Sequence, residues 1–392
     1  MDTADPEDRP GPLVVVAPDK FKGSLTAAEA AAALSRGLRR ALPGVRVVEH
    51  PIADGGEGSL EMVLAHGFRP VRCEVHGPTG ERVQATYALD GVDALVEMAA
   101  AAGLGRLPGG LPDDRTARTA STYGVGELIR CALDRGARRI VLAVGGSATT
   151  DGGAGMAAAL GARFEMSSGP RRPEGGADLL DVERLDLDGL DGRLAGATVV
   201  VACDVDNPLT GPSGAAAVYG PQKGASVSTV ALLDRALDHW ADLVAAATGR
   251  DLRSLPGAGA AGGLGFGAAA LLGAEVRSGV ETLLDLSGFA RTVAGADLVI
   301  VGEGSLDEQS LRGKGPIGVA AAAARAGARV VAVAGRSALA PDQVRPLGIA
   351  EVHTLSELQP DAELSMRHAA DLLETAAERI AAAWLRHRPE RT

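Results

Sequence analysis

The sequence contains very little lysine and asparagine. Its 39 basic residues include 4 lysines, which leaves 39 − 4 = 35 arginines, and Asn207 is its single asparagine. The lysines are Lys20, Lys22, Lys223 and Lys314. Lysine is a compact point charge, and asparagine both donates and accepts hydrogen bonds, so arginine or aspartate replaces neither without loss. We therefore expect these positions to lie where the chemistry requires them.

Other shortages exclude several classes of protein. The 3 cysteines share no spacing, which argues against a disulfide scaffold or a zinc cluster. The 39 basic residues are outnumbered by 50 acidic ones, and the net charge of −11 argues against a general nucleic-acid binder. No run of about 18 uncharged apolar residues is present to form a membrane span.

The first residues of the chain are acidic and contain proline. They lack the basic segment and the apolar segment of a signal peptide, so we predict a disordered tail over residues 1–11. We expect a soluble, cytoplasmic protein that binds neither nucleic acid nor membranes.

Hydrophobic patterns at both ends of the chain predict alternating strands and helices. The strands are short β-branched runs of the kind buried in parallel sheets, and Thr26-Ala-Ala-Glu29 forms a capping box at a helix start. The expected strands are 13–17, 45–50, 298–301, 330–334 and 350–354, and the expected helices are 26–42, 317–325 and 361–386.

The middle of the chain has a different pattern. It predicts a meander of strands, an acidic surface or loop segment at 181–193, and further strands and helices. The expected strands are 71–75, 82–89, 94–98, 140–144 and 198–202, and the expected helices are 125–135, 227–248 and 262–273.

These patterns predict an α/β fold with two domains. One doubly wound domain forms from both chain ends, residues 12–69 plus 292–392, and a mixed α/β second domain, residues 70–291, is inserted between them.

Five loops concentrate glycine, carboxylate and lysine, and four of them follow a predicted strand, where open α/β sheets bind ligands. The first, residues 19–24, holds two lysines and a serine before a helix, which favours an anion site over a solvated polar loop. The second, residues 53–59, brackets Asp54 and Glu57 with three glycines. Its backbone can approach a ligand closely, or Glu57 merely stabilises the next helix start.

The third loop, residues 145–155, has 5 glycines in 11 residues. Backbone N–H groups and hydroxyls in such a loop form a nest for phosphate oxygens. Because every glycine loses much backbone entropy on folding, this density favours a function over a structural turn.

The fourth loop, residues 203–209, contains Asp204, Asp206 and Asn207. If the preceding strand continues, its period of two places both carboxylates on one face, about 6.6 Å apart. Such a pair suits Mg²⁺, or one metal ligand and one base, although aspartate-rich turns also precede prolines such as Pro208.

The fifth loop joins acidic residues at 302–307 to a cationic segment at 312–315. This pattern fits a functional site and a charged loop without a function equally well. Residues 257–262 match the pattern GxGxxG, but no strand precedes them, so we reject a dinucleotide site there. The glycine–lysine pairs of the chain also lack the spacing of a P-loop.

Taken together, these loops resemble the glycerate kinase family of the bacterial, two-domain type without a P-loop. The resemblance runs from Ala17 to about Arg336. It rests on the motifs Ala17–Ser24, Ala53–Gly58, Gly145–Thr149, Cys203–Leu209, Tyr219–Gly224, Gly257–Gly265, Gly302–Gly304 and Leu311–Gly318. It implies ATP-dependent phosphorylation of D-glycerate with Mg²⁺, a flavodoxin-like first domain, and an active site in the cleft between the domains.

We assign the site residues on this basis. The catalytic residues are Asp54 or Asp206 as the base, with Lys20 and Lys22 neutralising charge. The residues expected to bind the nucleotide phosphates are Gly145, Gly146, Ser147, Thr149, Ser24 and Lys314. Those expected to bind the substrate are Asp19, Glu57, Asn207 and Arg312, and the magnesium ligands are Asp204, Asp206 and Glu303.

Three questions stay open at this point. The product is 2-phosphoglycerate or 3-phosphoglycerate, with the first favoured. A kinase for another small hydroxy acid and a non-catalytic nucleotide sensor are the alternative functions. The sequence does not fix the oligomeric state, for which a homodimer is one option.

Overall fold

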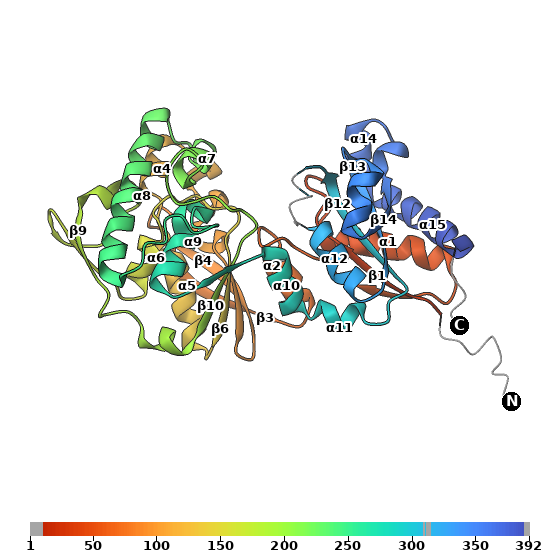
Figure 1. The fold of residues 1–392 in the computed structure, drawn as a ribbon, viewed down its shortest axis with the longest axis horizontal. Coiled ribbons are helices and arrows are strands. Elements are labelled where there is room, and N and C mark those ends of the chain that lie inside the picture. The colour runs from red at the N-terminus through yellow and green to blue at the C-terminus, as the bar shows by residue number, and fades with distance from the viewer. Residues whose placement is uncertain (1–10, 309, 311–314, 388–392) are drawn as a thin grey trace. The chain divides into compact units, whose positions relative to one another are not determined.

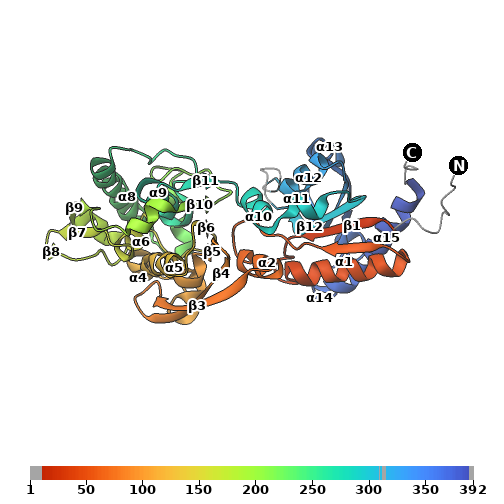
Figure 2. The same cartoon turned by 90° about the horizontal axis from the view of Figure 1, so that it is seen from below.

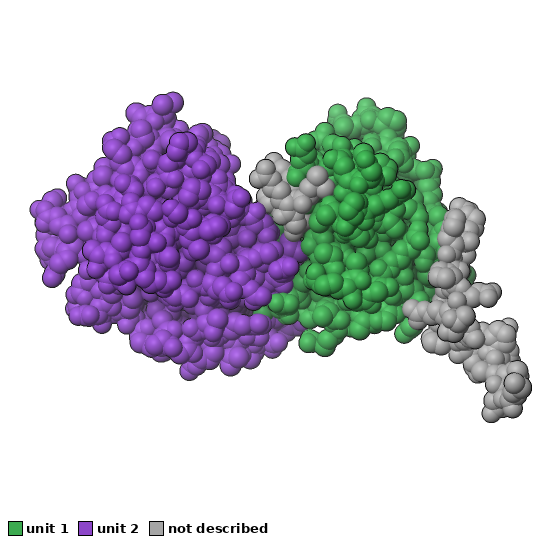
Figure 3. Space-filling view, in the orientation of Figure 1, with its two compact units in different colours: residues 1–54, 283–392 green, residues 55–282 purple. Residues whose placement is uncertain are grey.

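The computed structural model describes residues 11–308, 310 and 315–387, so the expected tail lies almost wholly outside the described residues. Two compact units make up the chain (Figure 3). Unit 1 consists of residues 1–54 and 283–392, and unit 2 of residues 55–282.

The unit boundaries differ from the expected 69/70 and 291/292. Residues 55–69 belong to unit 2, because α2 (Ser59–Ala65) packs against β4 (Arg82–Asp90) and β5 (Asp93–Glu97) of that unit. Residues 283–291 belong to unit 1, where the Phe289 ring stands edge-on to the buried His50 ring at 5.0 Å between centroids.

Unit 1 contains a sheet of five strands whose neighbours are all parallel (Figure 1). In chain order the strands are β1 (Leu13–Pro18), β2 (Arg46–Glu49), β12 (Leu298–Leu306), β13 (Arg329–Ser337) and β14 (Ile349–Thr354). Across the sheet they run β2-β1-β12-β13-β14, so the strand order reverses between β1 and β12. Ligands of open α/β sheets bind outside the carboxyl ends of the strands at such a reversal.

Helices pack on the sheet of unit 1, and α1 and α15 lie side by side along it (Figure 2). Alternate residues of β1 and β12, among them Val14, Val16 and Ile300, form one apolar core with these two helices. The helix α12 contacts β1, β12 and β13. The helices of this unit are α1 (Ala27–Ala41), α11 (Phe289–Val293), α12 (Pro316–Arg325), α13 (Pro341–Val344), α14 (Ala362–Arg367) and α15 (Ala369–His387).

The helix expected over 361–386 is wrong in one respect, because two helices occupy this stretch. The backbone leaves the helical conformation at His368, with φ −107° and ψ 22°, and α15 begins at the next residue. A single non-helical residue does not disturb the apolar periodicity from which the helix was predicted.

Unit 2 contains a six-stranded mixed sheet in the order β11-β10-β6-β5-β4-β3. Strands β3, β4 and β5 form the expected antiparallel meander, and β5, β6, β10 and β11 are parallel. The carboxyl ends of these four strands therefore lie at the same edge. The strands not yet given are β3 (Arg69–His76), β6 (Arg139–Ala143), β10 (Thr198–Ala202) and β11 (Glu275–Arg277).

The chain has further helices, some of which line a core that includes the buried Trp240. Ser226 caps the longest of them, α8, which has the bounds that the sequence predicts. These helices are α3 (Ala99–Ala102), α4 (Asp114–Thr119), α5 (Tyr123–Asp134), α6 (Ala154–Ala159), α7 (Ala215–Tyr219), α8 (Val227–Thr248), α9 (Ala260–Leu271) and α10 (Gly279–Ser287).

The segment 181–193, expected as acidic surface or loop, is partly a strand. A small antiparallel sheet has the order β8-β7-β9, with β7 (Arg163–Met166), β8 (Gly169–Pro170) and β9 (Val182–Asp186). Val182 and Leu185 of β9 are buried against the α8 core. Because the strand is short and its neighbours are acidic, its two apolar positions did not give a recognisable strand pattern in the sequence.

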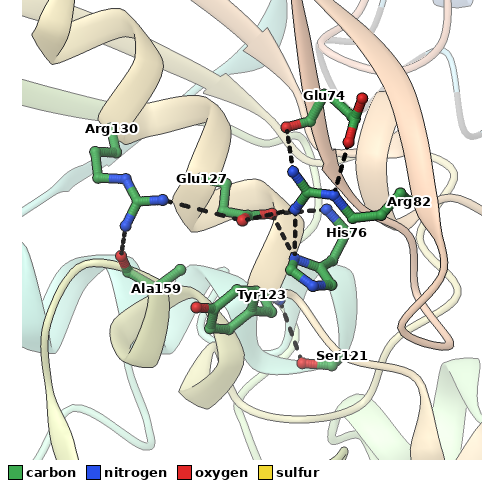
Figure 4. Close-up of polar contacts among 8 residues, drawn as sticks. All are labelled: Glu74, His76, Arg82, Ser121, Tyr123, Glu127, Arg130 and Ala159. Atoms are coloured by element: carbon green, nitrogen blue, oxygen red, sulfur yellow. Dashed lines mark hydrogen bonds and ion pairs between the residues drawn. The ribbon is translucent and has the colours of Figure 1, made fainter.

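A polar network fixes α5 against β3 and β4 (Figure 4). Glu127 of α5 is 7% exposed and accepts a hydrogen bond from the His76 backbone N–H at 2.6 Å. The Arg82 guanidinium of β4 lies 3.4 Å from the same carboxylate, and the Tyr123 ring stands edge-on to His76. Buried charges of this kind need partners, and here the partners hold α5 against the two strands.

No helix in residues 11–308, 310 and 315–387 is long and apolar enough to span a membrane.

Candidate active site

Acidic side chains gather where the strand order of unit 1 reverses. Asp19 follows β1, Glu303 lies on the neighbouring strand β12, and the Asp19 N–H donates to the Gly302 carbonyl at 2.7 Å. Both carboxylates approach Gly315, the residue before α12, where a Cβ would lie 3.6 Å from Asp19 Oδ2 and 4.0 Å from Glu303 Oε2. The parallel register thus brings together two acids from distant parts of the sequence.

Burial makes these two carboxyls unusual acids. Desolvation raises the pKa of Asp19 to about 6, although the nearby Lys20 opposes the rise. Desolvation likewise raises the pKa of Glu303 to about 7, opposed by a hydrogen bond that the Ser310 hydroxyl donates at 2.6 Å. The Asp54 charge raises both pKa values further. The cluster can therefore hold or release protons near neutral pH.

The lysines of the first loop have different surroundings. Lys20 Nζ lies 3.8 Å from Asp19 Oδ1 and 4.0 Å from Asp54 Oδ1, so the structure brings the predicted base Asp54 close to a predicted cation. Lys22 is exposed to solvent. The Ser24 hydroxyl donates to the Phe21 carbonyl at 3.0 Å, within the turn that leads into α1.

The predicted anion site at the start of α1 has a protein anion already in place. The Glu29 carboxylate accepts hydrogen bonds from the Thr26 N–H and hydroxyl, both at 2.9 Å, and completes the capping box. This carboxylate repels a second anion, so the two lysines, and not the helix end, carry the positive charge of the loop.

The glycine-rich loop of unit 2 follows β6 at the carboxyl edge of the sheet. A Cβ at Gly145 would lie 2.5 Å from the Gly56 Cα, so the loops 145–155 and 53–59 touch backbone to backbone. Gly146 has φ 70°, and Ser147 is 8% exposed and pairs with Gly103 in an isolated β-bridge. The glycines here allow a close approach that side chains would prevent.

Asp151, Thr149 and Thr150 of this loop are completely or almost completely buried. Asp151 accepts hydrogen bonds from the Thr122 N–H and hydroxyl, at 2.7 and 2.8 Å, and from the N–H groups of Gly153 and Gly155. Burial nevertheless raises its pKa. The hydroxyls of Thr149 and Thr150 have no hydrogen-bond partner among the described residues. A buried hydroxyl without a partner costs free energy, and a phosphate oxygen is one acceptor that relieves this cost.

The fourth loop differs from its expected geometry. β10 ends at Ala202, so no strand carries Asp204 and Asp206 on one face, and the inferred spacing of about 6.6 Å does not apply. Asp204 Oδ1 accepts hydrogen bonds from the Ser278 hydroxyl at 3.0 Å and the Gly279 N–H at 2.9 Å. Asp206 is exposed.

Asn207 uses both halves of its amide group. Its amide nitrogen donates to the Ser213 carbonyl at 2.8 Å, while its amide oxygen accepts from the Tyr219 hydroxyl at 2.6 Å. An aspartate could accept but not donate, so it would leave the Ser213 carbonyl without this bond. The side chain thus shapes the loop that presents Asp204 and Asp206.

The loop 53–59 lies at the same edge of unit 2 from Gly55 onward. A Cβ at Gly55 would lie 3.1 Å from the Ala202 carbonyl oxygen, at the end of β10. Glu57 is exposed, and the Glu97 carboxylate at the end of β5 accepts from the Leu60 N–H in the first turn of α2 at 2.7 Å. Unit 2 therefore collects three of the predicted loops at one sheet edge.

Two predicted residues, Arg312 and Lys314, lie outside the described residues. Among those that are described, no group of three or more His, Cys, Asp or Glu side chains is arranged to hold a metal ion. Mg²⁺ is commonly bound by one or two carboxylates together with substrate phosphates, and the oriented Asp204 carboxylate fits such a role.

Lys223 was not among the predicted site residues, although it is one of the few lysines. It is 2% exposed, and its Nζ donates to the Thr149 carbonyl at 2.6 Å. The scarcity of lysine and the motif Tyr219–Gly224 were the available signals, but neither predicts its contact, which joins residues 74 positions apart in the sequence.

Parallel strands with acidic and glycine-rich loops at their carboxyl ends define an α/β protein suited to binding a phosphorylated ligand. Comparison with known proteins identifies the group. The sequence profile of the Glycerate kinase family matches residues 14–385, and the chain belongs to this family.

Individual relatives are similar over most of their length. The chain is 44% identical to the glycerate kinase of Bacillus subtilis (strain 168) over 372 residues, which cover 94% of this chain and 97% of the relative. It is 43% identical to the glycerate 2-kinase of Escherichia coli (strain K12) over 325 residues, 82% and 84% of the two chains. A crystal structure of a candidate glycerate kinase 2 from Salmonella typhimurium LT2 has a TM-score of 0.83 and 42% identity, covering 96% and 99%.

Proposed function

We propose that this protein transfers the terminal phosphoryl group of ATP to D-glycerate and that the product is 2-phosphoglycerate. The observation that carries the proposal is its 44% identity, over 94% of the chain, to a relative named glycerate kinase. The name of the Escherichia coli relative, glycerate 2-kinase, supports the 2-hydroxyl as the acceptor.

Phosphoryl transfer depends on positioning and charge neutralisation more than on covalent chemistry. In our proposal the loop of unit 2 binds the phosphates of ATP through the backbone of Gly145 and Gly146 and the hydroxyls of Ser147 and Thr149. The buried Thr149 hydroxyl without a described partner supports this role, because phosphate supplies acceptors.

Unit 1 supplies charged groups in this proposal. Lys20 and Lys22 neutralise the transferring phosphoryl group or the glycerate carboxylate, and Asp54 accepts the proton of the attacking hydroxyl. The 4.0 Å between Lys20 Nζ and Asp54 Oδ1 supports a base and a cation that work together. Asp206 of unit 2 is the alternative base. Ser24, Lys314, Asp19, Glu57, Asn207 and Arg312 keep the binding roles assigned from the sequence.

When bound, Mg²⁺ neutralises phosphate charge and orients the phosphate oxygens. Asp204 and Asp206 of unit 2 and Glu303 of unit 1 are the carboxylates proposed to hold it. The donors on Asp204 Oδ1 support this assignment for Asp204, because they fix the direction of its carboxylate.

The proposal also includes a doubly wound, flavodoxin-like arrangement for unit 1. Its strand order, 2-1-3-4-5 when the strands of this sheet are numbered along the chain, supports that arrangement. A cytoplasmic location and a homodimer stay predictions from the sequence.

An ADP-release assay tests the proposed substrate. It compares D-glycerate, tartronate, lactate and sugar acids at equal ATP and Mg²⁺, and we expect the largest kcat/KM for D-glycerate by at least about tenfold. A larger kcat/KM for another acid would identify a different hydroxy-acid kinase. ATP binding without turnover of any acid would identify a nucleotide sensor.

A further inference from the structure

Lys223 is a fully buried lysine that contacts the predicted phosphate-binding loop, residues 145–155. It lies in the turn between α7 and α8, and its ammonium group donates to the Thr149 carbonyl at 2.6 Å. Burial lowers the pKa of this ammonium to about 7, while the charge of Asp151 acts in the opposite direction. A buried charge costs folding free energy, so its presence calls for a role that a neutral side chain does not fill.

The Thr149 carbonyl is also held by backbone. A Cβ at Gly262 would lie 1.9 Å from the Thr149 oxygen, and Gly262 has φ 68°, which glycine adopts readily. The Gly262 carbonyl in turn accepts from the Gly152 N–H at 3.0 Å. The start of α9, which the sequence marks as a glycine-rich motif without a dinucleotide site, therefore packs directly on the loop.

The geometry of a trans peptide links this carbonyl to the opposite side of the loop. In a trans peptide the C=O and the following N–H point in opposite directions. Because the Lys223 ammonium holds the Thr149 carbonyl, the Thr150 N–H of the same peptide points away from Lys223. Rotation of this one peptide plane would reverse the direction in which the Thr150 N–H points.

We propose that Lys223 is a positioning residue for the nucleotide: it fixes the Thr149–Thr150 peptide so that the loop presents N–H donors to the phosphates of ATP. This inference rests on the proposed function, in which the loop starting at Gly145 binds those phosphates. Lys223 then acts through the loop without contact to ATP. Its loss weakens nucleotide binding selectively and leaves glycerate binding unchanged.

The test measures KM for ATP and for D-glycerate separately in Lys223→Met and Lys223→Gln. Methionine removes both the charge and the donor, whereas glutamine keeps a neutral donor on a shorter side chain. Loss of a charge-assisted hydrogen bond predicts a rise of about 10- to 100-fold in KM for ATP in Lys223→Met, with a smaller rise in Lys223→Gln. KM for D-glycerate stays within about twofold of the unchanged protein.

Arg193→Met is the matched control. It also replaces a cation of unit 2 with methionine, but Arg193 pairs with Asp134 and Asp191 at 2.6 Å on the surface. We expect unchanged kinetics for this variant. Amide hydrogen exchange of the ligand-free protein adds a direct readout: peptides covering 145–153 exchange faster in Lys223→Met, and peptides from β3 and β4 do not.

A folded Lys223→Met variant with unchanged KM for ATP would overturn the inference. So would a parallel rise of KM for both substrates, because it indicates a general structural role. If Lys223→Met does not fold, Lys223→Gln decides by the same two criteria. If the unchanged protein does not phosphorylate D-glycerate, the proposed function fails, and calorimetric ATP binding to the same variants still tests Lys223.

Discussion

The two units place different chemistry at the carboxyl ends of their parallel strands. Unit 1 brings Asp19, Lys20, Asp54 and Glu303 together, and its cluster is made of side-chain charge. Unit 2 brings backbone together, because its loops touch at Gly56 and Gly145 with no room for a Cβ. Side-chain charge is suited to moving protons, and exposed backbone donors are suited to binding phosphate.

The lysines show the same difference. Lys20 is about one-third exposed, lies between two carboxylates and can meet a ligand, whereas Lys223 is buried on a carbonyl and acts on the protein itself. One residue type therefore lies in two different environments. The following variants test whether charge in unit 1 and backbone in unit 2 make separable contributions.

The largest effect is expected for Asp54→Asn in unit 1. Loss of a general base lowers kcat by about 10²- to 10⁴-fold, and the asparagine keeps the size of the side chain. An ADP-release assay at saturating substrates measures it, with the exposed Asp342→Asn of the same unit as the control. If Asp54→Asn and Asp206→Asn both keep nearly normal kcat, neither aspartate is the base.

A smaller effect, on binding, is expected for Gly145→Ala in unit 2. The added Cβ would lie 2.5 Å from the Gly56 Cα and would displace the glycine-rich loop 145–155. We expect KM for ATP to rise about tenfold, the equivalent of about 1.4 kcal/mol, with a smaller change in kcat. Gly192→Ala is the matched control, since no atom lies within 4 Å of its Cβ position. Equal KM values in both variants would contradict a role of this loop in nucleotide binding.

The acids of unit 1 predict a pH dependence of stability. The pKa of Glu303 is about 7 in the folded protein against 4.5 ordinarily, so the folded state binds the proton more tightly. This contribution is fully present below pH 4.5 and is lost as pH rises through 7. Urea unfolding in EDTA measures it, and Glu303→Gln flattens the dependence in this window. A dependence that persists unchanged in Glu303→Gln would remove Glu303 as its source.

Lys223 of unit 2 predicts the opposite slope in a higher window. Its folded-state pKa of about 7 lies below its ordinary 10.5, so the unfolded chain binds the proton more tightly. Stability therefore rises with pH between 7 and 10.5 from this group, and Glu303→Gln leaves that rise intact. If Glu303→Gln removed both the fall of stability through pH 7 and its rise between pH 7 and 10.5, the two units would not titrate separately.

The smallest effect is expected for Ala261→Gly in unit 2. Ala261 is the one non-glycine residue with positive φ among those described, at φ 52° and ψ 40°. Relief of this strain outweighs the greater freedom of glycine in the unfolded chain, and we expect stabilisation by up to about 1 kcal/mol. Urea unfolding measures the change. Clear destabilisation would show that the packing of the Ala261 methyl group matters more than its backbone strain.

Much of the fold could be predicted because local signals agree with the packing. The β-branched run of β10 and the Ser226-capped helix α8 have the bounds that the sequence predicts. The prediction failed where one residue decides, as at His368, where a helix ends. The paired geometry of Asp204 and Asp206 required β10 to continue beyond its predicted end, and β10 ends at Ala202. Such breaks depend on contacts made elsewhere in the unit, which a sequence window does not contain.

The candidate site shows the same limit. The loops could be located, because glycine and carboxylate at strand ends are local features. Their partners could not, since the contacts of Lys223 with Thr149 and of Gly262 with the same carbonyl arise only when α7, α9 and β6 pack together. The partners of Asn207 are a further case, because its amide contacts Ser213 and Tyr219 and no sequence window predicts these contacts.

Phosphorus NMR of the reaction product tests the central claim most directly. ATP, Mg²⁺, D-glycerate and the full chain are incubated, and the proton-coupled spectrum is recorded. Because the carbon at the 2-position of glycerate carries a single proton, we predict a new phosphate-ester doublet that grows together with the ADP signals. A triplet, from the methylene group at the 3-position, would contradict the proposed acceptor. Absence of any new ester would contradict the proposed function.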